Sequence, residues 1–389
     1  MTGQHEIAGN IPLFRYCGVW KAIQRASSQT WKEDENGWEG RFPWGTVETG
    51  EEASKFGCWY DHIFHMANIV MTCWDYYTYT LDHEYLEKVY FVIKVCAKFY
   101  TRNSIYRDGD EYYIGKVTDM EELGVSVERA FMTTCAVIRC LQIEADAAGI
   151  LEVDSDYARE CRDISEHLKR NLPIENNMYV PYPHCKQRCI SVFAGQYPYS
   201  VLSADDRAQL VSMDDYMKHE KFDNSIYGEA KKSSHWTTEW KVNAYVRMRL
   251  LNETEKELDR IVSLCGPFGE AAEVNELPKI YNRPWFMSAE GAILSAVVGM
   301  LVDRKFPNGD IFICPAMAPT DKKISFSLPV VGDITVCAKV EKKVLVECRV
   351  IGGENCRERL VNVTLPEWIS FEGNTTSDRR TVIYKVEKN

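Results

Sequence analysis

Apolar residues recur at intervals of three and four until about residue 305, which is the pattern of helices that bury one face. After that point they fall into short β-branched runs, separated by Gly, Pro and Asp, that often alternate with polar residues as strands do. The predicted helices cover residues 14–31, 60–80, 84–101, 127–148, 154–171, 204–219, 236–251, 253–265 and 287–304. The predicted strands cover residues 311–314, 324–328, 334–340, 344–350, 360–365 and 382–386. Irregular structure is predicted for residues 1–12 and 172–196.

These patterns predict a mainly α chain. Residues 1–305 are expected to form helical hairpins, and residues 306–389 a small sheet or sandwich. A tight repeat of about 20–50 residues is absent from the sequence, so a closed helical array is favoured over a solenoid.

A predicted hairpin is followed directly by an acidic cluster. Asp108-Gly109 lies between two aromatic, strand-like runs, and this dipeptide is a strong hairpin signal. The second run leads into Asp119, Glu121 and Glu122, just before a predicted helix. Carboxylates this close repel one another, so they are either solvated in a surface loop or have a function. This stretch alone leaves both interpretations open.

Composition narrows the classes of partner. The chain has 389 residues, 45% of them hydrophobic, which is enough for a large core. Its formal net charge of −11 argues against nucleic acid or an anionic membrane as a partner bound through a basic face. The 10 Trp and 21 Tyr residues, many of them beside Asp or Glu, suit sugars, which present C–H faces and hydroxyl groups. Packing between helices accounts for most of these aromatic residues as well.

Cysteine usage indicates a reducing compartment. Most of the 14 cysteines lie in apolar helical runs, where thiols behave as small hydrophobic side chains. The sequence has no C-x-x-C pair, so we expect neither a metal nor another cofactor. It also has no signal-peptide pattern and no apolar run of about 18 residues or more. We therefore expect a cytoplasmic protein.

Four segments resemble, in their order along the chain, motifs of glycoside hydrolase families 65 and 95. The loop GRFPW at 40–44, followed by ETGEE at 48–52, is similar to a family 65 loop. The segment VTDMEEL at 117–123 is similar to the family 65 motif that carries the general acid. The segment SAEG at 288–291 resembles a further family 65 motif. The run WTTEWKVNAYVRMRL at 236–250 resembles family 95, the 1,2-α-fucosidase family.

The resemblance implies an (α/α)6 barrel glycosidase or phosphorylase. The barrel, over residues 1–305, is then the catalytic domain, and residues 306–389 form a C-terminal β-sandwich-like domain. Both families also carry an N-terminal β-sandwich and a first barrel helix, and this sequence contains neither. We therefore expect a barrel that is incomplete at its N-terminus, and an upstream β-sandwich domain or chain that completes it.

Inverting cleavage needs two carboxylates, and the resemblance assigns the first of them. Glu122 takes the place of the general acid, with Glu121 and Asp119 as alternatives, and Glu290 is the candidate base, with Glu239 as its alternative. The two carboxyl groups should lie about 6.5–9.5 Å apart on opposite sides of the scissile bond. The competing interpretations are a solvated acidic loop for Glu122 and a favourable charge near a helix N-terminus for Glu290.

Further candidate residues would bind the sugar. Arg41, Trp44 and Glu48 belong to the Trp-rich loop. The candidates in the predicted helix 236–251 are Trp236, Glu239, Trp240, Lys241 and Asn243. Trp240 and Asn243 lie three residues apart and so share one helix face.

Three functions remain open, each with a carbohydrate as the partner. The first is an inverting glycoside hydrolase that uses water. The second is a disaccharide phosphorylase, in which inorganic phosphate attacks and Lys231, Lys232, Ser233 and Ser234 hold it near a helix start. The third is a non-catalytic carbohydrate-binding fragment. We favour the hydrolase, because a carboxylate at Glu290 would repel phosphate.

Overall fold

The computed structural model describes part of the chain, in two compact units. The described residues are 5–27, 38–47, 49–53, 57–120, 125–219, 235–276, 280–371 and 380–388. The helical unit consists of Gly9–Trp74 and Glu84–Lys232, and the sheet-containing unit of Met1–Ala8, Asp75–His83 and Ser233–Asn389. The predicted domain boundary after residue 305 differs from this division and stays a prediction.

Helices form most of the helical unit. They are α1 (His5–Ser27), α2 (His65–Thr80), α3 (His83–Asn103), α4 (Phe131–Leu151), α5 (Ser155–Arg170) and α6 (Arg207–Lys218). The first residues of α1 and α3 and the last residues of α2 belong to the other unit. Two 3-10 helices, η1 (Cys58–Asp61) and η3 (Ile190–Phe193), join them. The described helices lie where apolar periodicity predicts them, except that α1 already begins at His5, within the stretch predicted to be irregular.

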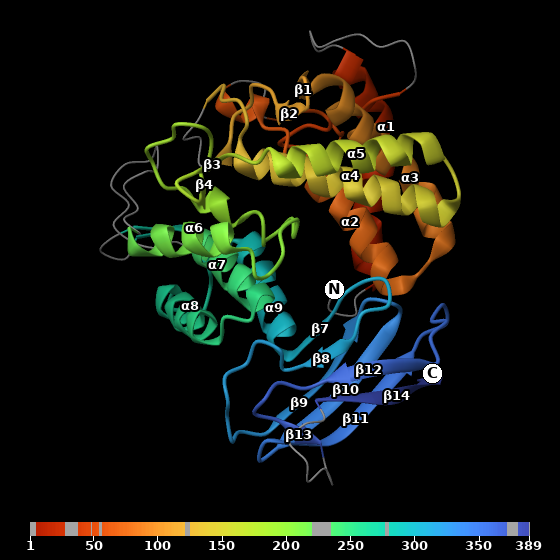
Figure 1. Cartoon of the computed structure of the whole chain (residues 1–389), viewed down its shortest axis with the longest axis vertical. Coiled ribbons are helices and arrows are strands. Elements are labelled where there is room, and N and C mark those ends of the chain that lie inside the picture. The colour runs from red at the N-terminus through yellow and green to blue at the C-terminus, as the bar shows by residue number, and fades with distance from the viewer. Residues whose placement is uncertain are drawn as a thin grey trace. The chain divides into compact units, whose positions relative to one another are not determined.

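The central helix of this unit is α4. Most of its side chains are buried, and its sequence is apolar on nearly every face, as expected of a helix surrounded by others. Its neighbour α5 lies alongside it (Figure 1) and is instead amphipathic, with one buried face and one charged face. From α3, Tyr90 donates its hydroxyl to Glu144 Oε1 of α4 at 3.0 Å, in the buried contact between these helices.

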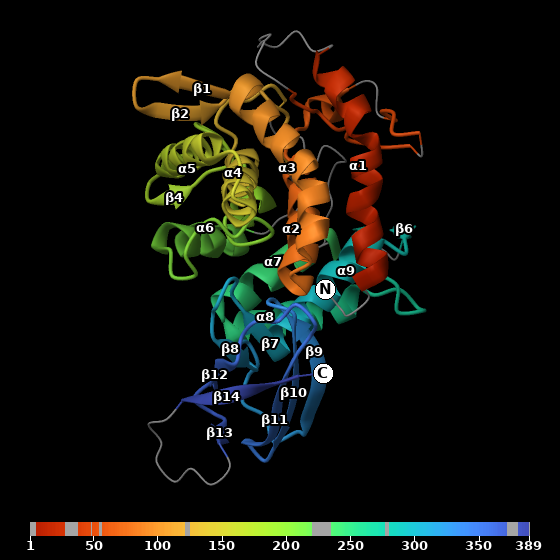
Figure 2. The same ribbon diagram turned by 90° about the vertical axis from the view of Figure 1, so that its right-hand side faces the viewer.

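Two hairpins interrupt the helices of this unit. Strands β1 (Ile105–Asp108) and β2 (Glu111–Ile114) form the predicted hairpin, with Gly109 at φ 59° in its two-residue turn, and β2 packs against α5 (Figure 2). Strands β3 (Ile174–Glu175) and β4 (Met178–Tyr179) form a second hairpin, so the prediction of a structureless loop there was wrong. Its turn residues Asn176 and Asn177 both have positive φ, which Asn tolerates in such turns.

The sheet-containing unit begins with three helices and a hairpin. The helices are α7 (His235–Met248), α8 (Leu251–Leu264) and α9 (Met287–Leu301), and the hairpin is formed by β5 (Ala272–Glu276) and β6 (Ile280–Pro284). Val242, Ile261 and Ala296 bring α7, α8 and α9 into one small apolar core.

One hydrogen-bonded sheet of eight strands follows α9. The strands are β7 (Val302–Arg304), β8 (Ile311–Ile313), β9 (Ile324–Val330), β10 (Ile334–Glu341), β11 (Val344–Gly352), β12 (Leu360–Thr364), β13 (Ser370–Phe371) and β14 (Thr381–Lys388). All six predicted strands are confirmed. The sheet order is β7-β8-β12-β14-β11-β10-β9, with β13 paired to β11.

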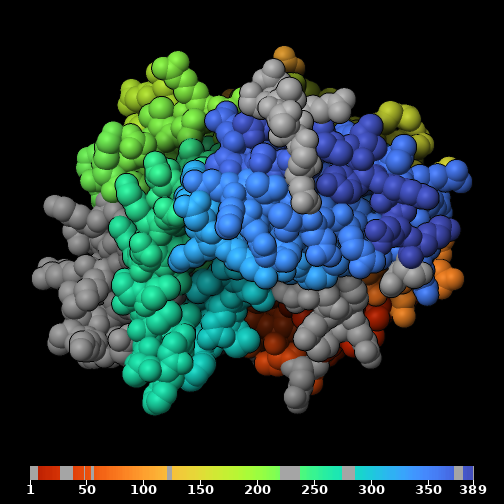
Figure 3. Space-filling model, turned by 90° about the horizontal axis from the view of Figure 1, so that it is seen from below, coloured from red at the N-terminus to blue at the C-terminus, as the bar shows by residue number. Residues whose placement is uncertain are grey.

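The sheet curls around a core of its own. Along β10 buried residues alternate with half-buried ones, and every strand of the sheet contributes to the same apolar cluster. Residues of β7 and β9, at the two ends of the sheet order, are in contact. The outer surface of these strands is shown in blue in Figure 3.

Candidate active site

The Trp-rich loop is held in shape by one carboxylate. Glu52 accepts the backbone N–H groups of Trp44 and Gly45, each at 2.9 Å, and forms an ion pair with Arg25 of α1. A carboxylate that accepts two backbone N–H groups and one guanidinium fixes the loop where Trp44 begins. Glu52 was not among the predicted site residues, although it ends the motif that carries the resemblance. The predicted ligand Glu48 lies outside the described residues.

Arg41 supports the loop from the protein interior. Its side chain is fully buried and donates to the carbonyl oxygen of Tyr60 in η1. Burial and the nearby Arg25 lower the pKa of Arg41 to about 10, so the guanidinium stays charged at neutral pH. In this position Arg41 positions the loop, and its predicted contact with sugar stays a prediction.

Trp44 belongs to a cluster of rings on the loop and at the start of α2. Its ring centroid lies 4.6 Å from that of His62, 5.2 Å from that of Phe64 and 5.3 Å from that of His65. Burial lowers the pKa of His62 to about 4 and that of His65 to about 3, so both imidazoles are neutral at pH 7. The result is an uncharged cluster of packed rings, in which His62 and Phe64 are buried and Trp44 and His65 are half-buried.

The tautomer of His65 follows from its partner. Its Nε2 lies 3.0 Å from the carbonyl oxygen of Phe42, which can only accept, so Nε2 carries the proton. Nδ1 is therefore an acceptor, and it is buried without a hydrogen-bond partner among the described residues.

The described part of the acidic loop places a carboxylate at the start of α4. Asp119 is 1% exposed, and the hydroxyl of Thr133 in the first turn of α4 donates to its Oδ1 at 3.2 Å. Val117 and Val127 close the loop through two backbone hydrogen bonds of 3.0 and 2.9 Å. A negative charge is favourable near a helix N-terminus. Glu121 and the predicted acid Glu122 lie outside the described residues, so the predicted spacing between Glu122 and Glu290 is still a prediction.

The helix α7 carries a buried carboxyl group that has no charge partner within the described part of the chain. Glu239 is 4% exposed, and its Oε2 has no hydrogen-bond partner among the residues the structure describes. Burial raises the pKa of Glu239 to about 9, because an ionised carboxylate would lose its hydration there. Glu239 is therefore protonated at neutral pH, which is the state that a proton donor requires.

Two other candidates on α7 hold the helices together. Lys241 is fully buried, and its Nζ lies 3.2 Å from Glu257 Oε2 of α8. Asn243 donates from Nδ2 to the carbonyl oxygen of Glu239 at 2.8 Å and to that of Ala292 in α9 at 2.9 Å. These contacts give both residues a packing role. A contact of either with sugar stays a prediction.

The remaining candidates lie on α7 and α9. Trp240 is half-buried, and the side chain of Trp236 lies outside the described part of the structure. Glu290 is half-buried in the first turn of α9, where the helix N-terminus favours its negative charge. Just before this helix, Trp285 has φ 61° and is 58% exposed. A non-glycine residue with positive φ is uncommon, so the chain turns sharply where it enters α9.

The described residues offer no group of three or more His, Cys, Asp or Glu side chains that could hold a metal ion. Their helices also include none that is both long and apolar enough to cross a membrane.

The fold is that of the (α/α)6 glycosidases. A structure titled putative kojibiose phosphorylase from human microbiome matches with a TM-score of 0.57 at 12% identity, over 99% of this chain and 52% of that chain. A GH78 family rhamnosidase of Bacillus sp. GL1 matches with a TM-score of 0.52 at 15% identity, over 83% of this chain and 34% of that chain. Together with the helices and the terminal sheet, these likenesses define the class: a mainly α glycosidase fold followed by a β domain.

Within this class, the model of the glycosyl hydrolase family 95 catalytic domain matches residues 10–301, and the chain belongs to that family. A kojibiose hydrolase of Mucilaginibacter mallensis is 28% identical over 155 residues, which are 39% of this chain and 22% of that protein. The chain thus matches about a fifth of the length of this relative. The resemblance to families 65 and 95 is confirmed.

Proposed function

We propose that the chain hydrolyses a glycosidic bond of an oligosaccharide or glycoside by an inverting, two-carboxylate mechanism. The observation that carries this proposal is the match of the family 95 catalytic domain to residues 10–301, because this range contains the acidic loop, the Trp44 ring cluster and Glu290. The name of the relative from M. mallensis suggests kojibiose as the first substrate to test.

In this mechanism Glu122 protonates the glycosidic oxygen while Glu290 removes a proton from water. The oxygen of that water bonds to the anomeric carbon from the opposite face, and the bond from the anomeric carbon to the leaving oxygen breaks. The products are a sugar of inverted anomeric configuration and a free alcohol. Water fits between the two carboxyl groups when they lie about 6.5–9.5 Å apart.

The raised pKa of Glu239 decides which role this residue can have in the mechanism. A carboxyl group with a pKa of about 9 keeps its proton at neutral pH and so is a poor general base. This argues against Glu239 as the alternative to Glu290. It favours a protonated Glu239 that donates a hydrogen bond to the sugar or takes the place of Glu122 as the acid.

The location of the protein is a proposal as well. All 14 cysteines are free thiols, and seven of them are buried in the structure. Free thiols persist in reducing compartments, which supports a cytoplasmic chain.

Phosphate dependence tests the hydrolase against the phosphorylase. We expect the purified chain to release glucose from kojibiose in phosphate-free buffer, at a rate that added inorganic phosphate leaves unchanged. Cleavage that needs phosphate and yields a sugar phosphate would establish the phosphorylase instead. Binding of kojibiose without cleavage under either condition would favour the non-catalytic fragment.

A further inference from the structure

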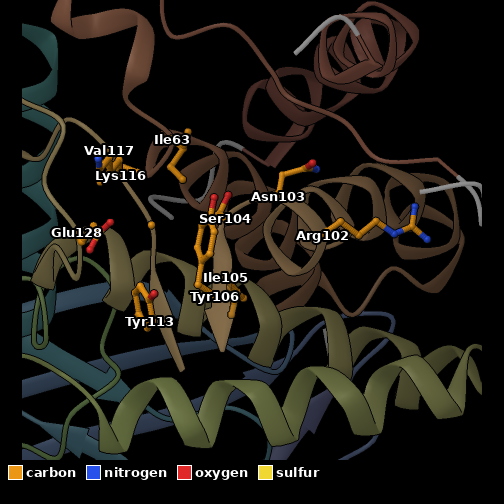
Figure 4. A pocket seen from close by; sticks show the side chains of 11 residues that line it. Ile63, Arg102, Asn103, Ser104, Ile105, Tyr106, Tyr113, Lys116, Val117 and Glu128 are labelled. Atoms are coloured by element: carbon orange, nitrogen blue, oxygen red, sulfur yellow. The ribbon is translucent and has the colours of Figure 1, made fainter. Parts of the chain in front are cut away.

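A pocket of about 510 Å³ lies between the end of α3, the β1–β2 hairpin and the segment that leads into the acidic loop (Figure 4). This volume falls in the range of about 300–1,000 Å³ that is usual for small-molecule sites. Its lining includes Ile63, Ser104, Tyr106, Tyr113, Lys116 and Glu128, all of the helical unit. None of these residues is a predicted site residue.

One wall of the pocket is aromatic and has a fixed orientation. The rings of Tyr106 and Tyr113 stack with centroids 5.9 Å apart and planes 22° apart, and Tyr106 is 45% exposed. At Gly115 an added Cβ would lie 2.2 Å from Cε2 of Tyr106, so the ring can take this position only because residue 115 has no side chain. The pocket therefore presents a flat apolar face beside the hairpin.

Polar groups surround this face. Ser104 is 3% exposed, and neither its Oγ nor Oδ1 of Asn103 has a hydrogen-bond partner among the described residues. A buried polar atom left unpaired is unfavourable, and a polar ligand can supply the missing partner. Lys116 and Glu128 are exposed and form no ion pair within the described part of the chain. In Figure 4 they lie on one side of Tyr106, and Asn103 lies on the other.

We propose that this pocket is a carbohydrate-binding subsite that holds a neutral sugar unit away from the bond that is cleaved. The C–H face of the sugar stacks on Tyr106, and its hydroxyl groups bond to Ser104, Asn103, Lys116 and Glu128. Three charged side chains line the pocket: Arg102, which forms an ion pair with Glu39, and Lys116 and Glu128, which have opposite charges. This balance suits a neutral polyol better than an ionic ligand. The choice of carbohydrate as the ligand class rests on the proposed function.

The backbone connects this pocket with the candidate active site. Ile63 lies between His62 and Phe64, whose rings contact Trp44, and Val117 lies two residues before the buried Asp119. Each segment thus contributes one side chain to the pocket and, within two positions of it, a residue to the candidate active site. An oligosaccharide that occupies both places would be held over more than one sugar unit.

Ring signals of tyrosine test the proposal directly. The full chain is labelled with ¹³C-tyrosine, the signals of Tyr106 and Tyr112 are assigned with Tyr106→Phe and Tyr112→Phe, and kojitriose, maltotriose and 2′-fucosyllactose are titrated into the ~10 mM range. Tyr112 is the matched control, because it lies in the same hairpin but stacks on His167, at a centroid distance of 4.4 Å, outside the pocket. We expect at least one sugar to shift the Tyr106 signal and leave that of Tyr112 in place.

A second measurement uses a variant that we expect to keep its structure. Lys116→Ala removes an exposed side chain, so it should leave the melting temperature unchanged and weaken the binding of the sugar that shifts Tyr106 by about threefold or more in calorimetry. The proposal is overturned if none of the three sugars moves the Tyr106 signal, or if Lys116→Ala binds that sugar as tightly as the natural chain. Because the readout is binding, a chain that hydrolyses sugar without moving Tyr106 refutes the pocket alone. A chain that moves Tyr106 without hydrolysis refutes the proposed function alone.

Discussion

The carboxylate of Glu52 accepts the backbone N–H of Trp44 at 2.9 Å, so the position of the Trp44 ring depends on a residue eight positions further along the chain. The same carboxylate accepts the N–H of Gly45 and pairs with Arg25. Removing a charged side chain that accepts such hydrogen bonds costs about 1.5–3 kcal/mol.

Glu52→Ala should therefore lower the free energy of unfolding by about 1.5–3 kcal/mol. It should also lower kcat/KM for an oligosaccharide by tenfold or more, because Trp44 loses its fixed position. Urea unfolding and steady-state kinetics measure the two effects. Glu51→Ala, at the exposed neighbouring position, is the control, and equal effects of the two substitutions would contradict the role of Glu52.

The ion pair between Lys241 and Glu257 predicts that substituting Lys241 lowers stability, which a contact of Lys241 with sugar alone does not predict. Both side chains are buried, so Lys241→Ala leaves the Glu257 charge without this partner and should cost about 3–5 kcal/mol. The double variant Lys241→Met/Glu257→Leu removes both charges and should recover most of that loss. Urea unfolding at pH 7 compares the three proteins. A double variant no more stable than Lys241→Ala would show that the pair is not what Lys241 contributes.

Stability should fall as pH rises because of Glu239. Its pKa is about 9 in the folded chain against an ordinary value of 4.5, so between these values the folded state holds a proton that the unfolded state has released. This contribution is fully present below about pH 4.5 and is lost as pH rises through 9, with a slope of at most about 1.4 kcal/mol per pH unit. Glu239→Gln keeps the neutral shape and removes the titration.

The check is urea unfolding of the natural chain and of Glu239→Gln at pH 6, 7 and 8. The free energy of unfolding of the variant, relative to that of the natural chain, should increase at each step. Parallel pH profiles of the two proteins would show that Glu239 ionises normally in the folded state.

Substrates with different leaving groups test which residue is the general acid. Glu122→Gln cannot donate a proton, so it should abolish cleavage of kojibiose and spare an activated aryl glycoside, whose leaving group needs little protonation. The same pair of substrates tested on Glu239→Gln identifies which carboxyl group is the donor. If Glu122→Gln slows both substrates equally, Glu122 does not act as the acid.

The local sequence pattern predicts most of the fold. Most helices, and the six strands predicted after residue 305, form where the apolar period predicts them, because each element buries one face against its neighbours. The β5–β6 hairpin and the short strands β7 and β13 were not predicted. The β3–β4 hairpin escaped prediction because its strands are only two residues long, and the Asn176-Asn177 turn was the available signal. The early start of α1 was not predicted either, because Pro12 lies inside this helix and proline usually indicates the absence of a helix.

The candidate site was less predictable, because its contacts join distant segments. The pattern of α7 places Lys241 and Asn243 correctly on a helix but does not show that they reach α8 and α9. Arg41 is likewise buried by other segments of the chain, so the sequence of its own loop does not indicate its burial. The pairing of Glu52 with Arg25 spans 27 positions, so no local spacing could indicate it.

The anomeric configuration of the released sugar tests the central claim most directly. Kojibiose is incubated with the chain in phosphate-free buffer, and the first glucose released is followed by ¹H NMR before mutarotation equalises the anomers. The reducing-end glucose is released as an equilibrium mixture of anomers, so the mechanism is read from the other glucose. An inverting mechanism with water activated by Glu290 predicts an initial excess of β-glucose over the equilibrium mixture, and at least a hundredfold slower release by Glu290→Gln. An initial excess of α-glucose, or undiminished release by Glu290→Gln, would contradict the account.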